Sequence, residues 1–295
     1  MGKLLVLDIG GTYIKYGLAD GSGALLPDSV RQTPSCAEGS AEDFLGILRR
    51  ILEEAQRHDT LQGACACIAG PFDFYCGVSL MKHKFQGLYG RSLRPPFEEK
   101  GVAVSFLHDS TAFMLGEYGD GSLQGESNAC CVMLGTGLGF AWIREGKVCV
   151  DKNQAPALAL WKTPYLDGIA EDYVSTRALQ RYYGEAISIK EMAGLARSGN
   201  ERAREAFLTA GHHLSLMMTE IIEKLGCAKF ALGGQIAKSA DLFRLRLPVP
   251  WAVTKHPDDA ALLGVCRYAA LGKENCVRVE PLDFGPLKGK DRQAL

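Results

Sequence analysis

The feature that most constrains this chain is the stretch Leu4–Leu18, in which a short apolar run leads into two consecutive glycines. Residues Leu4–Leu7 lack helical spacing, which predicts a strand that is buried on both faces. Gly10 and Gly11 let the backbone turn sharply, and the N–H groups of such a turn form an anion-binding concavity. The stretch therefore predicts a buried strand, a glycine turn and a second strand.

The polar side chains around this turn indicate a chemistry for it. Asp8 supplies a carboxylate that could hold a metal ion through water, while Thr12 adds a hydroxyl and Lys15 a positive charge. Together with the N–H groups of the turn, these groups suit a metal-bound nucleotide phosphate. The alternative is an ordinary hairpin turn with a strand-end Asp, because short glycine motifs often match by chance.

Charge and cysteine content narrow the classes of protein to consider. The 33 Lys and Arg against 34 Asp and Glu leave a net charge of −1, so we expect neither nucleic acid nor an anionic membrane as a partner. We find no apolar run near the ~20 residues that span a bilayer, and no signal peptide. Several of the ten cysteines lie in apolar runs and fit small buried side chains. We therefore expect a cytoplasmic protein of enzyme size.

Two similar domains are predicted along the chain. After the opening hairpin, residues 1–118 alternate strands and helices, which is typical of an α/β domain. A polar, glycine-rich break at 119–128 predicts a surface connection. The order of strand, glycine turn and strand then recurs around Gly135-Thr136-Gly137, as a weak internal repeat. We predict a second α/β domain at 119–271 and a tail at 272–295 that packs back on the first domain or is mobile.

Local signals also predict individual helices. Ser40 with Asp43 three residues later forms the pattern of a capping box at a helix start. Residues 201–225 place their apolar side chains on one face, and Gly226 follows as a stop. Another helix is expected to start near Asp258-Asp259, whose carboxylates suit the dipole at its N-terminus, and to run to about Leu271. The segment 151–168 carries no clear pattern.

Two further strand ends carry residues of chemical interest. Gly233 and Gly234 would allow close approach of a flat base or ribose, and three glycine turns are far more specific than one. Asp109 follows another strand and offers a carboxylate. Phosphoryl transfer to an alcohol needs positioning, charge compensation and a base beside the attacking hydroxyl, which Asp109 could supply. The alternative for Asp109 is the capping of a helix at 110–117.

Taken in order, these motifs resemble those of the ROK family (repressors, open reading frames and sugar kinases), within the actin-like, hexokinase-type ATPase superfamily. The matching stretches are LLVLDIGGTYIKYGLAD, LHDSTAFMLGE, VMLGTGLGFAWIREGKV, AEDYVSTRAL, FALGGQIAKS and DDAALLG. The resemblance covers nearly the whole chain. It implies an α/β fold of two actin-like (ribonuclease H-like) ATPase domains with an interdomain cleft, ATP with Mg²⁺, and phosphorylation of a hexose hydroxyl.

The resemblance also implies roles for particular residues. Those that match the family's phosphate and adenosine motifs are Asp8, Gly10, Gly11, Thr12, Lys15, Gly135, Thr136, Gly137, Gly233 and Gly234. Asp8 would hold Mg²⁺ through water, Asp109 matches the catalytic base, and Glu171 matches a sugar-binding glutamate. Family members are often dimers, so a homodimer is one expected assembly.

The chain departs from the family on the sugar side. Family members usually carry Gly-Glu-Ile-Gly-His and then a Cys-x-Cys-Gly-x-x-Gly-Cys zinc site, but residues 156–168 contain neither His nor Cys. A structural zinc site needs about four such ligands, so we expect no zinc. The Asn that usually precedes the catalytic Asp is His108 here, which we consider a sugar-binding candidate. The usual Pro-Asn-Leu stretch is replaced by His83-Lys84-Phe85.

The sequence therefore predicts an ATP-dependent sugar kinase, either glucokinase-like or N-acetylmannosamine kinase-like, with a small-molecule hexose as its substrate. The altered sugar side leaves a non-catalytic sugar or nucleotide sensor of the same family as the alternative. Which sugar is bound stays open.

Overall fold

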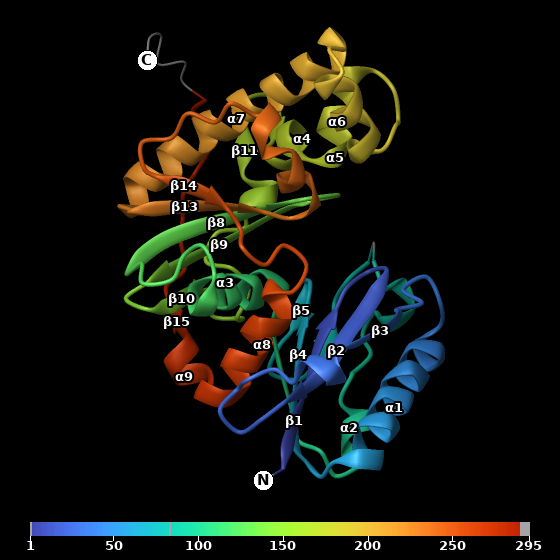
Figure 1. Cartoon of the computed structure of the whole chain (residues 1–295). Coiled ribbons are helices and arrows are strands. Elements are labelled where there is room, and N and C mark those ends of the chain that lie inside the picture. The colour runs from blue at the N-terminus through green and yellow to red at the C-terminus, as the bar shows by residue number, and fades with distance from the viewer. Residues whose placement is uncertain (1, 83, 290–295) are drawn as a thin grey trace. The chain divides into compact units, whose positions relative to one another are not determined.

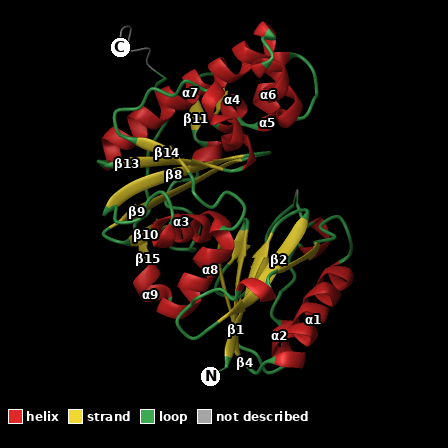
Figure 2. Cartoon of the chain, in the orientation of Figure 1, coloured by secondary structure: helices red, strands yellow, loops and turns green. Residues whose placement is uncertain are grey.

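The computed structural model describes residues 2–82 and 84–289, which divide into two compact units (Figure 1). The first unit is drawn from Met1–Asp120, Lys147–Pro156 and Asp259–Glu280, and the second from Gly121–Gly146, Ala157–Asp258 and Pro281–Leu295. Both units contain helices and strands (Figure 2), which confirms the predicted α/β class. Among the described residues, none of the helices combines the length and apolar character that a membrane span requires.

A five-stranded sheet forms the centre of the first unit, in the order β3-β2-β1-β4-β7. Its strands are β1 (Lys3–Ile9), β2 (Tyr13–Ala19), β3 (Arg31–Pro34), β4 (Leu61–Ile68) and β7 (Val104–His108). β1, β4 and β7 run parallel, while β2 and β3 return antiparallel. The register pairs Asp8 with Lys15 on one side and with Cys67 on the other. The carboxyl ends of the three parallel strands, and the residues that follow them, therefore lie along one edge.

Helix α1 (Ala41–His58) packs its apolar side chains into the same core as this sheet. It begins with the predicted capping box, because Ser40 Oγ accepts from the Asp43 N–H and the Asp43 carboxylate accepts from the Ser40 N–H. Phe44 and Leu48 are fully buried with Leu5 of β1. The remaining short elements before β7 are η1 (Pro27–Ser29), β5 (Phe72–Asp73), β6 (Val78–Ser79), η2 (Gln86–Leu88) and α2 (Pro95–Glu98).

Two helices of the first unit, α3 (Asp109–Asp120) and α8 (Ala260–Leu271), approach each other closely through glycine. A Cβ on Gly264 would clash with the backbone of Ala112, and one on Gly116 would clash with the backbone of Ala260. The glycines thus allow direct contact between the two helix backbones. The predicted helix that ends at Leu271 is confirmed, and α9 (Lys273–Cys276) follows it.

Part of the predicted tail has regular structure. β15 (Val277–Val279) pairs in parallel with β10 (Lys147–Val150) in the first unit. The compact units group α8, α9 and β15 with the first 120 residues, whereas the sequence placed the helix before residue 272 in the second domain. The division at 1–118, 119–271 and 272–295 stays a prediction about independent domains.

The second unit contains strands in the order β14-β13-β8-β9. These are β14 (Trp251–Val253), β13 (Lys229–Gly233), β8 (Asn128–Leu134) and β9 (Leu138–Arg144), with β8 and β9 antiparallel and the other pairs parallel. Its helices are α4 (Glu171–Val174), α5 (Thr176–Tyr183), α6 (Ile189–Arg197), α7 (Glu201–Leu225) and the 3-10 segments η3 (Leu160–Lys162) and η4 (Gln235–Leu242). The prediction of α7 and its Gly226 stop is confirmed, since Gly226 adopts the left-handed conformation that ends a helix.

The segment that gave no clear pattern in the sequence is anchored by aromatic side chains. It includes a small hairpin of β11 (Pro164–Tyr165) and β12 (Gly168–Ile169). Tyr165 is buried, and its hydroxyl lies 3.0 Å from Nδ1 of His213 on α7. Tyr173 and Tyr182 pack against the same histidine. These contacts hold the hairpin against α7.

Replacing Gly264 by alanine tests the contact between α3 and α8. We expect Gly264→Ala to lower the free energy of unfolding by about 1–3 kcal/mol, because overpacking forces the two helices apart. Gly46→Ala in α1 is the matched control, since a Cβ there would meet only the end of the Arg50 side chain, at 3.8 Å. Urea unfolding of both variants measures the difference. Equal stability of the two variants would contradict the close contact.

Candidate functional site

The first glycine turn is held from one side by Ser35. Gly10 donates its N–H to the carbonyl of Tyr13 at 3.0 Å, which closes the hairpin between β1 and β2. The carbonyls of Gly11 and Thr12 accept from Oγ and N–H of the fully buried Ser35, at 2.7 and 2.9 Å. A Cβ on Gly11 would meet no atom within 4 Å. The turn is thus supported on its carbonyl side, with open space beside Gly11.

Asp8 is a carboxylate in a mostly buried position at the end of β1. Burial raises its pKa to about 6, a hydrogen bond from the Cys67 thiol works against this rise, and the charge of Asp109 adds to it. The thiol sulfur lies 3.3 Å from Asp8 Oδ1. The charge of Lys15 also lowers the pKa of Asp8. A carboxylate in this environment gains from a nearby cation.

Lys15 reaches the same edge of the sheet from β2, where it stands opposite Asp8. Its ammonium nitrogen lies 2.9 Å from Oδ1 of Asp259, just before α8. The sequence did not suggest Asp259 as a site residue, because its carboxylate was explained by the helix dipole alone. The stretch DDAALLG, which contains Asp259, is one of the motifs that resemble the family, and it could have indicated that Asp259 lies near the site.

Asp109 begins α3 directly after β7, and almost half of its side-chain surface is exposed. Partial loss of water around the carboxyl raises its pKa, but the charge and hydrogen bond of His108, together with the Ser110 N–H, lower it more. The pKa of Asp109 therefore lies below its ordinary value. The Oδ1 atom of Asp109 lies 2.8 Å from His108 Nδ1 and accepts from the Ser110 N–H at 2.6 Å.

His108 is placed as a partner of Asp109. Its Nδ1 lies within 2.8 Å of both the Asp109 carboxylate and Ser110 Oγ, and its ring packs near that of Phe74. The role of His108 in sugar binding stays a prediction, and His83 lies outside the described residues. Lys84 adds a positive charge that also lowers the pKa of Asp109.

The Asp8 carboxylate at this edge is a kind of group that can bind Mg²⁺. Among residues 2–82 and 84–289, no group of three or more His, Cys, Asp or Glu side chains is placed to hold a metal ion. Mg²⁺ is usually bound by one or two carboxylates, several waters and substrate phosphates. Asp8 therefore fits as a ligand through water. The absence of zinc stays a prediction.

The second glycine turn, between β8 and β9, is also held from outside. Gly135 donates its N–H to the carbonyl of Gly137 at 3.0 Å. The carbonyl of Gly135 accepts from both the N–H and Oγ1 of Thr176, at 2.9 and 3.0 Å. Thr176 is the first residue of α5. A Cβ on Gly135 would meet no atom within 4 Å.

Glu171 lies against this second turn. Its Oε2 accepts from the Leu138 N–H at 2.9 Å, and its Oε1 lies 2.9 Å from Arg177. A Cβ on Gly137 would come within 2.9 Å of Oε2, so glycine leaves room for the carboxylate. Glu171, the predicted sugar ligand, is therefore already bonded to the backbone of Leu138, directly after the turn. Its contact with a sugar stays a prediction.

The third glycine junction, at the end of β13, serves a close backbone contact. Gly234 has φ of 83°, and a Cβ there would clash with the backbone of Leu134. Gly233 pairs with Met133 in the parallel register. These contacts explain why glycine is needed at 234, and the adenosine role of both glycines stays a prediction.

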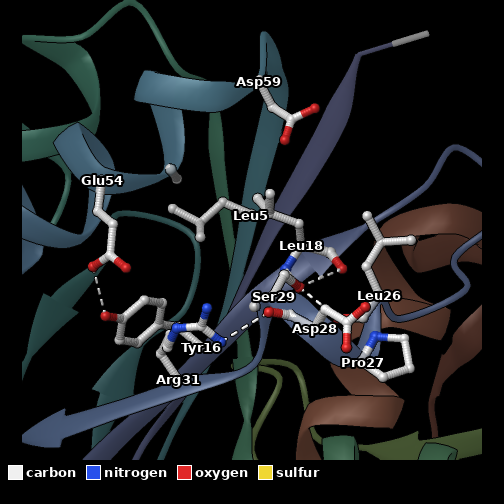
Figure 3. Close-up of a pocket in the computed structure, with 12 residues that line it drawn as sticks. Leu5, Tyr16, Leu18, Leu26, Pro27, Asp28, Ser29, Arg31, Glu54 and Asp59 are labelled. Atoms are coloured by element: carbon white, nitrogen blue, oxygen red, sulfur yellow. Dashed lines mark hydrogen bonds between the residues drawn. The ribbon is translucent and has the colours of Figure 1, made fainter.

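The predicted site residues thus fall into two sets, each within one unit. The set of the first unit is Asp8, Gly10, Gly11, Thr12, Lys15, His108 and Asp109, and the set of the second is Gly135, Thr136, Gly137, Glu171, Gly233 and Gly234. A separate pocket of about 460 Å³ in the first unit is lined by Leu5, Tyr16 and Leu18 among others (Figure 3). None of the predicted site residues lines it.

The comparison with protein families decides the affiliation of the chain. The model of the ROK family matches residues 4–154 of the 295. The chain belongs to the ROK family. The family predicted from the motifs is thereby confirmed.

Relatives and solved structures of this ROK protein extend the match. The N-acetyl-D-glucosamine kinase of Photobacterium profundum is 25% identical over 277 residues, 84% of this chain and 88% of that protein. Other curated relatives, among them an uncharacterised protein of Clostridium perfringens, match over about half of their own length.

Two crystal structures show the likeness of the fold. The ROK hexokinase of Thermus thermophilus has a TM-score of 0.72 at 24% identity, over 90% of this chain and 96% of that one. A ROK family transcriptional regulator, a homolog of the E. coli MLC protein, has a TM-score of 0.75 at 18% identity, over 90% and 76%. The predicted α/β fold is thereby confirmed as the fold of these ROK proteins.

The pKa of Asp8 predicts how stability depends on pH. Its pKa rises from 3.8 to about 6 on folding, so its charge destabilises the folded state above pH 6, and this effect disappears as the pH falls towards 3.8. Asp8→Asn removes the charge. Without Mg²⁺, we expect this variant to be more stable than the parent at pH 8, by up to about 3 kcal/mol, because one pKa unit corresponds to about 1.36 kcal/mol.

The control for this prediction is Asp20→Asn. Asp20 lies in a turn, and hydrogen bonds from Ser22 and Ala24 lower its pKa, so neutralising it brings no gain in stability. Thermal unfolding at pH 5 and pH 8, with a chelator present, measures both variants. A pH 8 stability of Asp8→Asn at or below that of the parent would contradict the assignment of a penalised buried charge.

Proposed function

We propose that this ROK protein is an ATP-dependent sugar kinase, which transfers the γ-phosphoryl group of ATP to a hexose hydroxyl. The observation that carries the proposal is the placement of Asp109 at the same sheet edge as Asp8 and the first glycine turn. A carboxylate base, a second carboxylate and an anion-binding turn are the parts that phosphoryl transfer to an alcohol needs. The similarity to an N-acetyl-D-glucosamine kinase over most of the chain supports it.

The nucleotide would be held by backbone and charge. The N–H groups of both glycine turns would bind its phosphates, and Lys15 would offset their negative charge. Gly233 and Gly234 would contact the adenosine. Asp8 would hold Mg²⁺ through water, and the ion, when bound, neutralises charge on the phosphates.

Asp109 would act as the general base. Because its pKa is lowered, the carboxyl is ionised at neutral pH and can accept the proton of the attacking sugar hydroxyl. His108 keeps the carboxylate oriented through Oδ1. His108 and Glu171 are the candidates for contacts with the other sugar hydroxyls. A carboxylate in this role typically contributes about 10² to 10⁴ to the rate.

The proposed function also bears on where the protein acts and what it binds. The balanced charge of −1 gives no support for a nucleic acid or membrane partner, so we propose a cytoplasmic enzyme that acts on a small sugar, as a monomer or a homodimer. Glucose and N-acetylhexosamines are the sugars to test first, because a glucokinase and N-acetyl-D-glucosamine kinases are among the relatives.

A non-catalytic sugar or nucleotide sensor is the second candidate. It is favoured by the changed sugar side of the sequence and by the structural likeness to a ROK transcriptional regulator. Asp8 and Asp109 argue for catalysis, because a sensor has no need of a carboxylate placed to accept a proton from the bound sugar.

A sugar panel separates the two functions. We expect release of ADP from Mg²⁺-ATP to be stimulated by at least one hexose, N-acetylhexosamine or β-glucoside, measured with a coupled assay. Glycerol and other polyols serve as controls for a non-sugar acceptor. If no sugar stimulates release but some sugars raise the melting temperature, the protein is a sensor.

Asp109→Asn tests the proposed base. We expect kcat to fall by about 10² to 10⁴, while the dissociation constant for ATP changes little, because the amide cannot accept the proton but nearly preserves the shape. Asp28→Asn is the control, since Asp28 lines the separate pocket of Figure 3. Near-normal turnover of Asp109→Asn would remove Asp109 from the mechanism.

A further inference from the structure

Both glycine turns contain the same dipeptide, and in each the same carbonyl is held from outside the turn. Gly11-Thr12 lies in the first turn, and Gly135-Thr136 lies in the second. The Gly11 carbonyl accepts from Ser35, and the Gly135 carbonyl accepts from Thr176. In each unit a hydroxyl side chain therefore fixes the peptide that joins the glycine to its threonine.

Ser35 has two donors on the first turn. Its Oγ lies 2.7 Å from the Gly11 carbonyl, and its N–H donates to the next carbonyl, that of Thr12, at 2.9 Å. Ser35 directly follows β3, whose last residue, Pro34, pairs with Tyr13. The strand pairing brings Ser35 to the turn, and complete burial of Ser35 keeps water from replacing its bonds.

Thr176 uses both of its donors on a single atom. Its N–H and Oγ1 donate to the Gly135 carbonyl at 2.9 and 3.0 Å. Thr176 is the first residue of α5, where backbone N–H groups have no partner inside the helix. The helix start thus supplies one bond to the turn, and the side chain supplies the second.

These bonds set the direction of the N–H groups. In a planar trans peptide the N–H points opposite to the carbonyl. With the Gly11 and Thr12 carbonyls turned to Ser35, the N–H groups of Thr12 and Tyr13 point away from it. With the Gly135 carbonyl turned to Thr176, the N–H of Thr136 points away from Thr176. Glycine peptides rotate easily, so without an anchor these N–H groups lose a fixed direction.

We propose that Ser35 and Thr176 are positioning residues, which hold the Gly–Thr peptides so that their N–H groups face the phosphates of the nucleotide. This inference rests on the proposed function, because it assigns the N–H groups to ATP. Neither residue is expected to touch the sugar or to take part in proton transfer. Removing either side chain should therefore weaken the binding of the nucleotide and leave the binding of the sugar nearly unchanged.

Removal of each hydroxyl tests the proposal. Ser35→Ala and Thr176→Val each delete the side-chain bond and keep the backbone N–H. We expect each to raise the dissociation constant of a non-hydrolysable ATP analogue with Mg²⁺ about three- to tenfold, as the loss of one hydrogen bond implies. The KM for ATP should rise by a similar factor, and the KM for the sugar should stay within twofold. Calorimetric titration and steady-state kinetics measure these values.

Each variant has a matched control in its own unit. Ser29, in η1, accepts through Oγ from the Leu18 N–H and donates to the Leu26 carbonyl, so Ser29→Ala removes a serine hydroxyl that bonds to β2 away from the turn. Thr163 Oγ1 donates to the Ala159 carbonyl, so Thr163→Val is the control for Thr176→Val. We expect both controls to bind the analogue within twofold of the parent, whatever their melting temperatures. Thr176→Ser keeps the hydroxyl and should restore tight binding.

The outcomes separate this inference from the proposed function. If the parent binds the analogue and the two variants bind it equally well, the positioning role is wrong and the kinase proposal stands. If the controls weaken binding as much as the variants, the effect is general destabilisation and the inference is again wrong. If the parent does not bind the analogue, both proposals fall. Should Ser35→Ala not fold, Thr176→Val alone decides, because Thr176 is partly exposed.

Discussion

The burial of the Asp8 carboxylate at the end of β1 is the constraint that shapes this edge of the first unit. β1 is flanked by β2 and β4, and its register sets Lys15 and Cys67 beside this carboxylate. The thiol and the ammonium offset only part of the penalty, because the pKa still rises to about 6. Further positive charge beside Asp8 would therefore lower the cost of ionising it, as the proposed Mg²⁺ would do.

The polar groups around this edge influence one another's pKa values. The charge of Asp109 makes Asp8 harder to ionise, while His108 and the Ser110 N–H make Asp109 easier to ionise. Two carboxylates at one edge thus differ in pKa because their surroundings differ. Lys15 is shared between Asp8 and Asp259, so the balance of charge extends to the residue before α8.

Much of the fold could be predicted because its signals are local. The strand at Leu4–Leu7, the capping box at Ser40 and the helix that ends at Gly226 each follow from neighbouring residues. The supports of the site could not be predicted in this way. Ser35 and Gly11 are 24 residues apart, and Lys15 and Asp259 are 244 apart. Nothing in the composition around these residues indicates their partners, which strand pairing and helix packing bring together.

The order in which the first unit is assembled from the chain has a consequence for biosynthesis. Its last helices and β15 come from residues 260–279, behind the whole of α7. During synthesis on the ribosome, the side of α3 that carries Gly116 therefore stays uncovered until α8 has emerged. A fragment that ends at residue 120 would carry that exposed face permanently, so it would be prone to self-association rather than to independent folding.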